Sequence, residues 1–273
     1  MTEPDGRDRV PMSAAAVGGG LVAGTAAGLF GVGGGVLLVP LLVLVLKRSQ
    51  HVAHATSLVA ITLAAVAGAG RFALDGSVAW AGGLAVAAGA VVGARFGARF
   101  LPKVSEGGLR RLFAGVLLLL ALRFLLVGAT GEAAVAGNVT PALDPLVVAL
   151  HVVGGLAAGV TSAVLGVGGG IIMVPLLVLG FGYGQHVAEG TSLAVIIPTA
   201  VTGAWAHHRN GYTDWPLGIQ LGSASVLGSI AGASLALSLD PVTLGRLYGG
   251  LQLAVGLLML RRTPDAPETE EPT

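Results

Sequence analysis

The chain contains no cysteine among its 273 residues. Disulfide bonds, thiolate catalysis and cysteine metal sites are therefore excluded. Charged residues are also scarce, at 11%, whereas a soluble domain carries about 25%. The net charge of +1 gives no overall positive field, so we expect no nucleic-acid partner. Hydrophobic residues make up 54%, which indicates that lipid, rather than water, surrounds the protein.

Apolar runs long enough to cross a bilayer, about 20 residues each, recur along the whole chain. The run from Pro11 to Phe30 could be mistaken for a signal peptide. Its counterpart near Val147 to Leu165 is internal and cannot be one, so we interpret both runs as membrane segments. We expect the single crossings near residues 52–74, 78–101, 109–128, 187–206, 216–237 and 242–260.

One sequence motif occurs twice. The stretch from Gly31 to Pro40, Gly-Val-Gly-Gly-Gly-Val-Leu-Leu-Val-Pro, returns from Gly166 to Pro175 as Gly-Val-Gly-Gly-Gly-Ile-Ile-Met-Val-Pro, 135 positions later. At the same offset, Gln-His-Val-Ala, Thr-Ser-Leu and a tryptophan recur, the first copies at residues 50–53, 56–58 and 80. An internal duplication that carries a helix-breaking glycine cluster is typical of transporter binding sites.

Basic residues predict how the repeats lie in the membrane. They cluster near residues 47–48, 95–111, 207–209 and 261–262. All clusters share the cytoplasmic side if each glycine segment is a hairpin that returns to its starting side. Each repeat then contains an odd number of crossings, and the second repeat starts outside. The fold class we predict is an all-α polytopic membrane protein with two inverted-topology repeats, each a glycine-broken helical hairpin plus three transmembrane helices. Charge does not decide whether the hairpin arms cross fully.

The repeats set the expected domain boundaries, with both termini cytoplasmic. We expect a cytoplasmic tail at 1–11, repeat 1 at 12–130, an external linker at 131–146, repeat 2 at 147–262 and a disordered cytoplasmic tail at 263–273. Glycines spaced four apart, as at Gly20, Gly24 and Gly28, predict helix backbones in close contact.

The glycine clusters are the first candidate binding site. Consecutive glycines disfavour a helix, and Pro40 and Pro175 fit the first position of a following helix. The N–H groups of Gly33, Gly34, Gly35, Gly168, Gly169 and Gly170 would then attract an anion. The alternative is a tight helix crossing without a ligand.

Hydroxyl groups recur beside the glycine clusters. Thr56, Ser57, Thr191 and Ser192 could donate hydrogen bonds to an oxyanion, or bond to their own helix backbone.

Gating or proton-linked candidates lie where each hairpin leads into the next helix. They are Gln50, His51, Gln185, His186 and Glu189. Histidine titrates near neutral pH, and an ionisable group inside a membrane helix indicates function. The alternative is that these groups lie near the interface and are solvated. We find no catalytic set and no metal site, and we expect no cofactor.

Several motifs together resemble one family. They are Gly-Leu-Phe-Gly-Val-Gly-Gly-Gly-x4-Pro-x-Leu at 28–42, its echo at 166–177, the Thr-Ser-Leu elements within 55–58 and 190–193, and Asn210-Gly211 before Trp215. In these residues the chain is similar to the TauE/SafE family of bacterial membrane proteins, sulfite exporters and relatives. The resemblance implies a multi-pass inner-membrane carrier for sulfite, sulfoacetate or other small anions.

We therefore expect a secondary transporter of small, sulfur-containing anions that works by alternating access, and not an enzyme. A channel-like anion conduit and a membrane enzyme or assembly factor for sulfur compounds are the alternatives. The expected partners are a small anionic substrate and the lipid bilayer. A coupling proton and a coupling sodium ion both stay open, as do a monomer and a homodimer.

Overall fold

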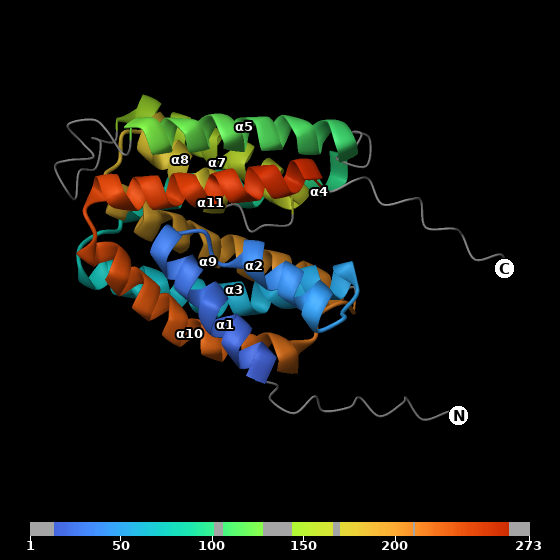
Figure 1. Ribbon diagram of the computed structural model, residues 1–273. Coiled ribbons are helices and arrows are strands. Elements are labelled where there is room, and N and C mark those ends of the chain that lie inside the picture. The colour runs from blue at the N-terminus through green and yellow to red at the C-terminus, as the bar shows by residue number, and fades with distance from the viewer. Residues whose placement is uncertain (1–13, 101–105, 128–143, 166–169, 210, 262–273) are drawn as a thin grey trace, which may run out of the picture.

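Every regular element in the described residues is a helix (Figure 1). The computed structural model describes residues 14–100, 106–127, 144–165, 170–209 and 211–261. The first half contains α1 (Ala14–Phe30), α2 (Gly35–Pro40), η1 (Leu41–Val45), α3 (Gln50–Leu74), α4 (Trp80–Phe100) and α5 (Glu106–Val127). The second half contains α7 (Pro145–Leu165), α8 (Gly170–Pro175), η3 (Leu176–Gly180), α9 (Gln185–Arg209), α10 (Trp215–Ser238) and α11 (Pro241–Arg261).

The all-α polytopic fold predicted from the sequence is confirmed. The six expected crossings coincide with α3, α4, α5, α9, α10 and α11. Of these, α3, α9, α10 and α11 are long and apolar enough to cross a membrane; the apolar stretches found in α4 and α5 are shorter, at 80–96 and 114–126. The two expected tails lie outside the described residues, as does most of the expected linker.

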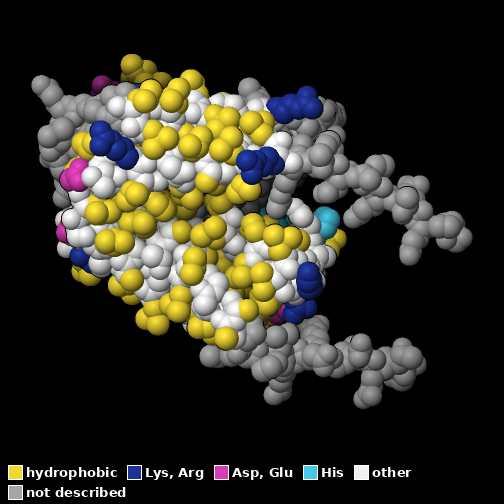
Figure 2. Space-filling view, viewed as in Figure 1, with side chains coloured by type: hydrophobic (Ala, Val, Ile, Leu, Met, Phe, Trp, Pro, Cys, Tyr) yellow, Lys and Arg dark blue, Asp and Glu magenta, His cyan; other side chains and the backbone are white. Residues whose placement is uncertain are grey.

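The surface and the interior have the distribution of a membrane protein. Hydrophobic side chains cover much of the face in Figure 2, and large ones such as Leu74 (88% exposed) and Leu126 (71%) point outward. Small and polar side chains are buried instead, among them Thr56, Ser225 and Gln252. Lipid can solvate the outer side chains, whereas buried polar groups must find partners inside the protein.

The two halves share local backbone geometry, not only sequence. The helix that follows each glycine break ends in the same turn, with positive φ at Lys47 (53°) and at Gly182 (74°). In each copy the next N–H closes the turn, from Arg48 to Leu42 O at 2.9 Å and from Tyr183 to Leu177 O at 3.0 Å. Because these positions differ by 135 residues, the sequence duplication is also a structural duplication.

Glycine faces bring helices of opposite halves into backbone contact. A Cβ on Gly24 of α1 would collide with the carbonyl of Ser225 on α10, and a Cβ on Gly159 of α7 would collide with that of Ala90 on α4. These two contacts exchange under the 135-residue offset. The close packing predicted from the glycine spacing is confirmed for these helices.

The equivalent central helices α3 and α9 run antiparallel to each other. Gly68, late in α3, faces Leu193, early in α9, and Gly203, late in α9, faces Leu58, early in α3. These contacts also exchange under the offset. The operation that relates the halves therefore reverses the direction of the central helix.

The hairpin arms lie side by side in the first half. Gly34 lies against the carbonyl of Ala23, and Gly19 lies against the side chain of Leu41, so the second arm runs back along α1. The second arm, 35–45, rises by about 16 Å, or about half of a hydrocarbon core of about 30 Å. It cannot cross the membrane alone.

The position expected for the prolines was wrong. Pro40 and Pro175 are the last residues of α2 and α8, because each helix restarts five residues earlier, at Gly35 and Gly170. Proline has no N–H for the i−4 bond, and the helix continues by widening into a π-helix, as in the bond from Leu46 N to Leu41 O at 3.1 Å. In the first repeat the non-helical backbone is therefore confined to residues 31–34.

Candidate functional site

The first glycine break lies at the centre of the protein. Gly31, Gly33 and Gly34 have φ values of 66°, 75° and 79°, a region that only glycine enters readily. A Cβ on Gly33 would lie 3.2 Å from both Ile61 Cγ2 and Ile196 Cδ1. These isoleucines are equivalent in the two repeats and lie at the middle of α3 and α9. Gly33 therefore lies close to the axis that relates the two halves.

The two repeats touch backbone to backbone at this break. A Cβ on Gly31 would lie 2.7 Å from Glu189 Cα, and a Cβ on Gly170 would lie 2.5 Å from Val32 Cα. The predicted site residues Gly33, Gly34, Gly35 and Gly170 are all buried here. Gly168 and Gly169 lie outside the described residues.

The two threonines link the repeats to each other. Thr56 Oγ1 accepts a hydrogen bond from Asp214 N at 3.1 Å, and Thr191 Oγ1 accepts one from Ala79 N at 2.9 Å. Both side chains are fully buried, and the two bonds exchange under the 135-residue offset. A hydroxyl that accepts a bond still carries a hydrogen to donate.

The two serines make different contacts. Ser192 Oγ donates to Gly31 O at 2.7 Å and so ties α9 to the glycine break. Ser57 Oγ donates to His54 O of its own helix at 2.8 Å, which is the local bond that serine commonly makes in helices. The counterpart of Gly31 is Gly166, which lies outside the described residues.

Glu189 is not solvated, contrary to the alternative that places it near the interface. Its side chain is fully buried in α9, and Gln185 Nε2 donates to its Oε1 at 2.8 Å. Glu189 Oε2 and Gln185 Oε1 are buried atoms without a hydrogen-bond partner among the described residues. The backbone of Glu189 lies against Gly31, so this residue is adjacent to the break.

Two polar residues of α11 at this site were missed in the sequence. Tyr248 Oη donates to Ile171 O at 2.9 Å, and Gln252 Nε2 donates to the same carbonyl at 3.3 Å. Both are fully buried, and they hold the first turn of α8 behind Gly170. The presence of Gln252 in an otherwise apolar helix could have indicated a buried polar contact.

The other gating candidates are not all close to the break. Gln50 and His51 are exposed at the start of α3, where His51 stacks on Tyr212 with ring centroids 5.4 Å apart. His186 is partly buried, and its Nε2 lies 3.0 Å from Ala236 O at the end of α10. Of this group, Glu189 contacts the glycine break directly, and Gln185 is linked to the break through its hydrogen bond to Glu189.

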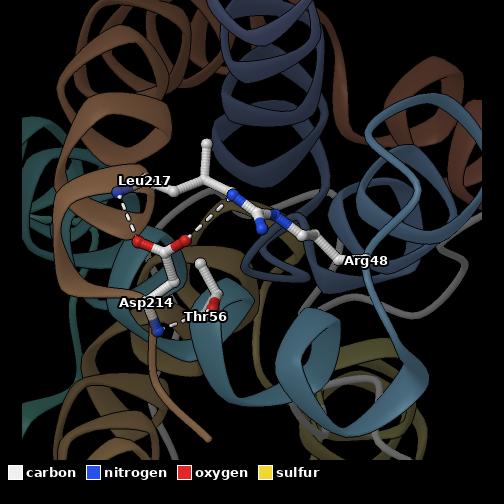
Figure 3. A network of polar contacts seen from close by, with 4 residues as sticks. All are labelled: Arg48, Thr56, Asp214 and Leu217. Carbon is white, nitrogen blue, oxygen red and sulfur yellow. Dashed lines mark hydrogen bonds and ion pairs between the residues drawn. The ribbon is translucent and has the colours of Figure 1, made fainter. Parts of the chain in front are cut away.

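An ion pair that we did not predict joins the repeats where α3 and α10 begin (Figure 3). Arg48 Nη2 lies 3.2 Å from Asp214 Oδ2, and Asp214 Oδ1 caps α10 by accepting from Leu217 N at 3.2 Å. Thr56 holds the backbone of the same aspartate. The sequence offers little indication of this network, because the charged pair is not repeated. Arg48 and Asp214 align with Tyr183 and Ala79 in the other repeat.

The counterpart of Arg48, Tyr183, forms a hydrogen bond instead of an ion pair. Tyr183 is buried, its Oη lies 2.9 Å from His151 Nε2, and His151 stacks on Phe181 at 4.0 Å. Burial raises the pKa of the Tyr183 hydroxyl above its usual value. The equivalent positions Arg48 and Tyr183 therefore make different contacts, an ion pair to the other repeat and a hydrogen bond within the second repeat.

The described residues contain no group of three or more histidine, aspartate or glutamate side chains able to hold a metal ion. The glycine break instead offers glycine backbone, the hydroxyl group of Ser192 and the neighbouring buried residue Glu189. Such a set can bind a polar solute through hydrogen bonds, and its place at the centre of a membrane protein suits a transport pathway.

Comparisons with known proteins agree with this description. The family model of the sulfite exporter TauE/SafE matches residues 2–124 and 151–273. The chain is 29% identical over 235 residues to the probable membrane transporter protein YdhB of Bacillus subtilis, covering 85% of this chain and 94% of that protein. A probable membrane transporter protein of Haemophilus influenzae is 24% identical over 258 residues, covering 88% and 95%.

No solved structure matches the chain. The family match covers both halves and breaks only between the repeats, and the relatives that span most of the chain are named as membrane transporters, not as enzymes. The chain belongs to the sulfite exporter TauE/SafE family of membrane transporters.

Proposed function

We propose that the protein is a secondary transporter that moves small, sulfur-containing oxyanions across the bacterial inner membrane by alternating access. The anion binds at the glycine junction, by which we mean the first glycine break, residues 31–34, together with the parts of the second repeat that contact it. One repeat rocks against the other to open the site to either side. The observation that carries this proposal is the position of Gly33 between the equivalent isoleucines Ile61 and Ile196. Transporters built from inverted repeats bind their substrates at such a midplane position.

The chemistry of the junction favours a weakly held anion. The first N–H groups of the helix that restarts at Gly35 have no partners within that helix, and the hydroxyls of Thr56 and Thr191 add donors. Among the described residues, the buried polar side chains include no lysine or arginine. Binding through neutral donors alone suits a carrier, which must also release its substrate.

Inverted topology is part of the proposal, and the antiparallel pairing of α3 with α9 supports it. Exchange of the halves reverses α3 and α9, so the axis relating them lies across the helices and in the plane of the membrane. Basic residues support our assignment of which end of the helices faces the cytoplasm. Arg48 contacts Asp214 at the start of α10, and Arg209 and Arg261 end the helices on either side of α10. We place this end in the cytoplasm.

Binding of candidate anions to the purified protein tests the substrate class. Calorimetric titration in nanodiscs with sulfite, sulfate, thiosulfate and chloride should give saturable binding of at least one sulfur oxyanion. Gly31→Ala should weaken that binding, because its Cβ meets the Glu189 backbone at 2.7 Å. Gly70→Ala is the matched control, since no atom lies within 4 Å of a Cβ there. Equal binding of chloride and the sulfur oxyanions would contradict the substrate class.

A further inference from the structure

The carboxyl group of Glu189 lacks the partners that a buried charge needs. It is 0% exposed, Gln185 supplies its single hydrogen-bond donor at 2.8 Å, and Oε2 has none among the described residues. Desolvation of a lone carboxylate is strongly unfavourable unless it is paired. In this environment the neutral, protonated form is the more stable one.

Among the described residues, the elements packed around Glu189 bring no cation to it. Arg71 of α3, next to the Phe72 that packs on Gly190, donates instead to Ser234 of α10 at 3.0 Å. From α11, Arg246 is exposed, and the buried Tyr248 hydroxyl donates to Ile171 O at 2.9 Å. The glycine break itself adds only the backbone at Gly31.

Gln185 can serve both protonation states of its neighbour. The 2.8 Å contact joins an amide nitrogen to a carboxylate oxygen, and rotation of the amide by half a turn would place Gln185 Oε1 there instead. That oxygen, which has no partner in the present arrangement, could then accept a hydrogen bond from the protonated carboxyl group. The pair therefore remains hydrogen-bonded before and after protonation.

The position of Glu189 links its protonation to anion binding. Its Cα lies next to Gly31, at the edge of the proposed anion site. A carboxylate there repels an oxyanion, and the repulsion is strong because the surroundings exclude water. Protonation removes the negative charge, so a proton and an anion each favour binding of the other.

We propose that Glu189 is a proton-binding site that makes the transporter a proton–anion symporter. The inference rests on the proposed function and names its coupling ion. When the site faces one side, the carboxylate takes a proton from water, forms an O–H bond and admits the anion. When the site faces the other side, the anion leaves, the O–H bond breaks and the proton returns to water. A metal cation would need several oxygen ligands at once, whereas a proton needs one.

Infrared spectroscopy tests the proton site without any transport. Wild-type protein in nanodiscs should show the carbonyl band of a buried carboxylic acid, and the band should lose intensity as the pH is raised. Glu189→Gln, which keeps the size and the contact to Gln185, should lack it. The exposed Asp240→Asn is the matched control and should keep it. Identical spectra of wild type and Glu189→Gln would overturn the assignment, whatever the protein transports.

Transport in proteoliposomes tests the coupling. Exchange of labelled sulfite or thiosulfate without a gradient reports the proposed function, and accumulation driven by a pH gradient reports the coupling. In wild type the apparent anion affinity should rise with falling pH, by up to about tenfold per pH unit. Glu189→Gln should exchange anions with little pH dependence and fail to accumulate them. Asp240→Asn should behave like wild type in both measurements.

The outcomes separate the two claims. The absence of anion exchange by the wild-type protein would contradict the proposed function. The infrared result would still decide whether Glu189 binds a proton. Accumulation by Glu189→Gln under a pH gradient, or accumulation driven by a sodium gradient alone, would overturn the symport mechanism. Thermal unfolding of each variant shows whether it is folded, and a folded Glu189→Gln without any exchange would also overturn it.

Discussion

Thr191 in the second repeat accepts a hydrogen bond from the backbone N–H of Ala79 in the first, at 2.9 Å. Thr56 makes the reciprocal contact with Asp214 N at 3.1 Å. Each repeat therefore fixes the start of a long helix in the other. The core of this transporter contains exchanged contacts of this kind, which tie each half to the other.

Removal of the Thr191 hydroxyl should destabilise the protein. In Thr191→Val the N–H of Ala79 is left buried without an acceptor, a change that costs about 1–3 kcal/mol. Thr199→Val is the matched control, because among the described residues Thr199 donates to carbonyls of its own helix, Ile196 O at 2.9 Å and Val195 O at 3.2 Å. Thermal unfolding in nanodiscs should show a larger drop for Thr191→Val, and equal drops would contradict the bridging role.

Alanine at Gly31 should destabilise the junction. Its φ of 66° costs an L-residue about 1–2 kcal/mol, and the added Cβ would overlap the Glu189 backbone. The open, helical Gly70 should instead tolerate alanine or gain up to about 1 kcal/mol. Melting temperatures of Gly31→Ala and Gly70→Ala should therefore move in opposite directions or differ widely. A Gly31→Ala variant as stable as wild type would show that the two repeats are not packed as described.

Asp214 should matter more for stability than its ion-pair partner. The side chains of Arg48 and Asp214 are 36% and 27% exposed, and such a pair contributes about 0–1 kcal/mol. Asp214 also caps α10, a role worth about 0.5–2 kcal/mol. We expect Arg48→Ala to change the unfolding temperature little and Asp214→Ala to lower it clearly. Asp214→Asn, which keeps the cap, should lie between them. Equal effects of Arg48→Ala and Asp214→Ala would contradict this division.

Single introduced cysteines test which side of the membrane each end faces. The unmodified chain contains no cysteine and serves as the unlabelled control. Gln50→Cys and Asp240→Cys replace exposed residues that we place on the cytoplasmic and outer sides. An impermeant maleimide should label Asp240→Cys in intact cells and Gln50→Cys only after permeabilisation. Labelling of both from the same side would rule out the inverted arrangement.

Helices and their breaks could be predicted from the sequence because they depend on local composition. Apolar length located α3 and α9 to within a few residues, and the glycine cluster located the break at 31–34. Pro40 was misplaced because its helix restarts at Gly35 and continues past the proline as a π-helix, through hydrogen bonding that no residue pattern shows. The Arg48–Asp214 pair could not be found, because it depends on how the two repeats pack together.

Burial of Glu189 could not be predicted for a similar reason. Its position five residues into α9 suggested the membrane interface, as for His186. The hairpin of the first repeat instead covers it, through the contact with Gly31. Contacts between the repeats decide which polar groups are buried, and a single sequence records only that the repeats exist.

Flux through the reconstituted protein tests the central claim most directly. Proteoliposomes loaded with unlabelled sulfite, sulfate or thiosulfate should take up the matching radiolabelled anion, and uptake should saturate with concentration. No flux of any of these anions with folded protein would contradict the proposed transport function. Flux that does not saturate and gives large unitary currents would contradict alternating access and favour a channel.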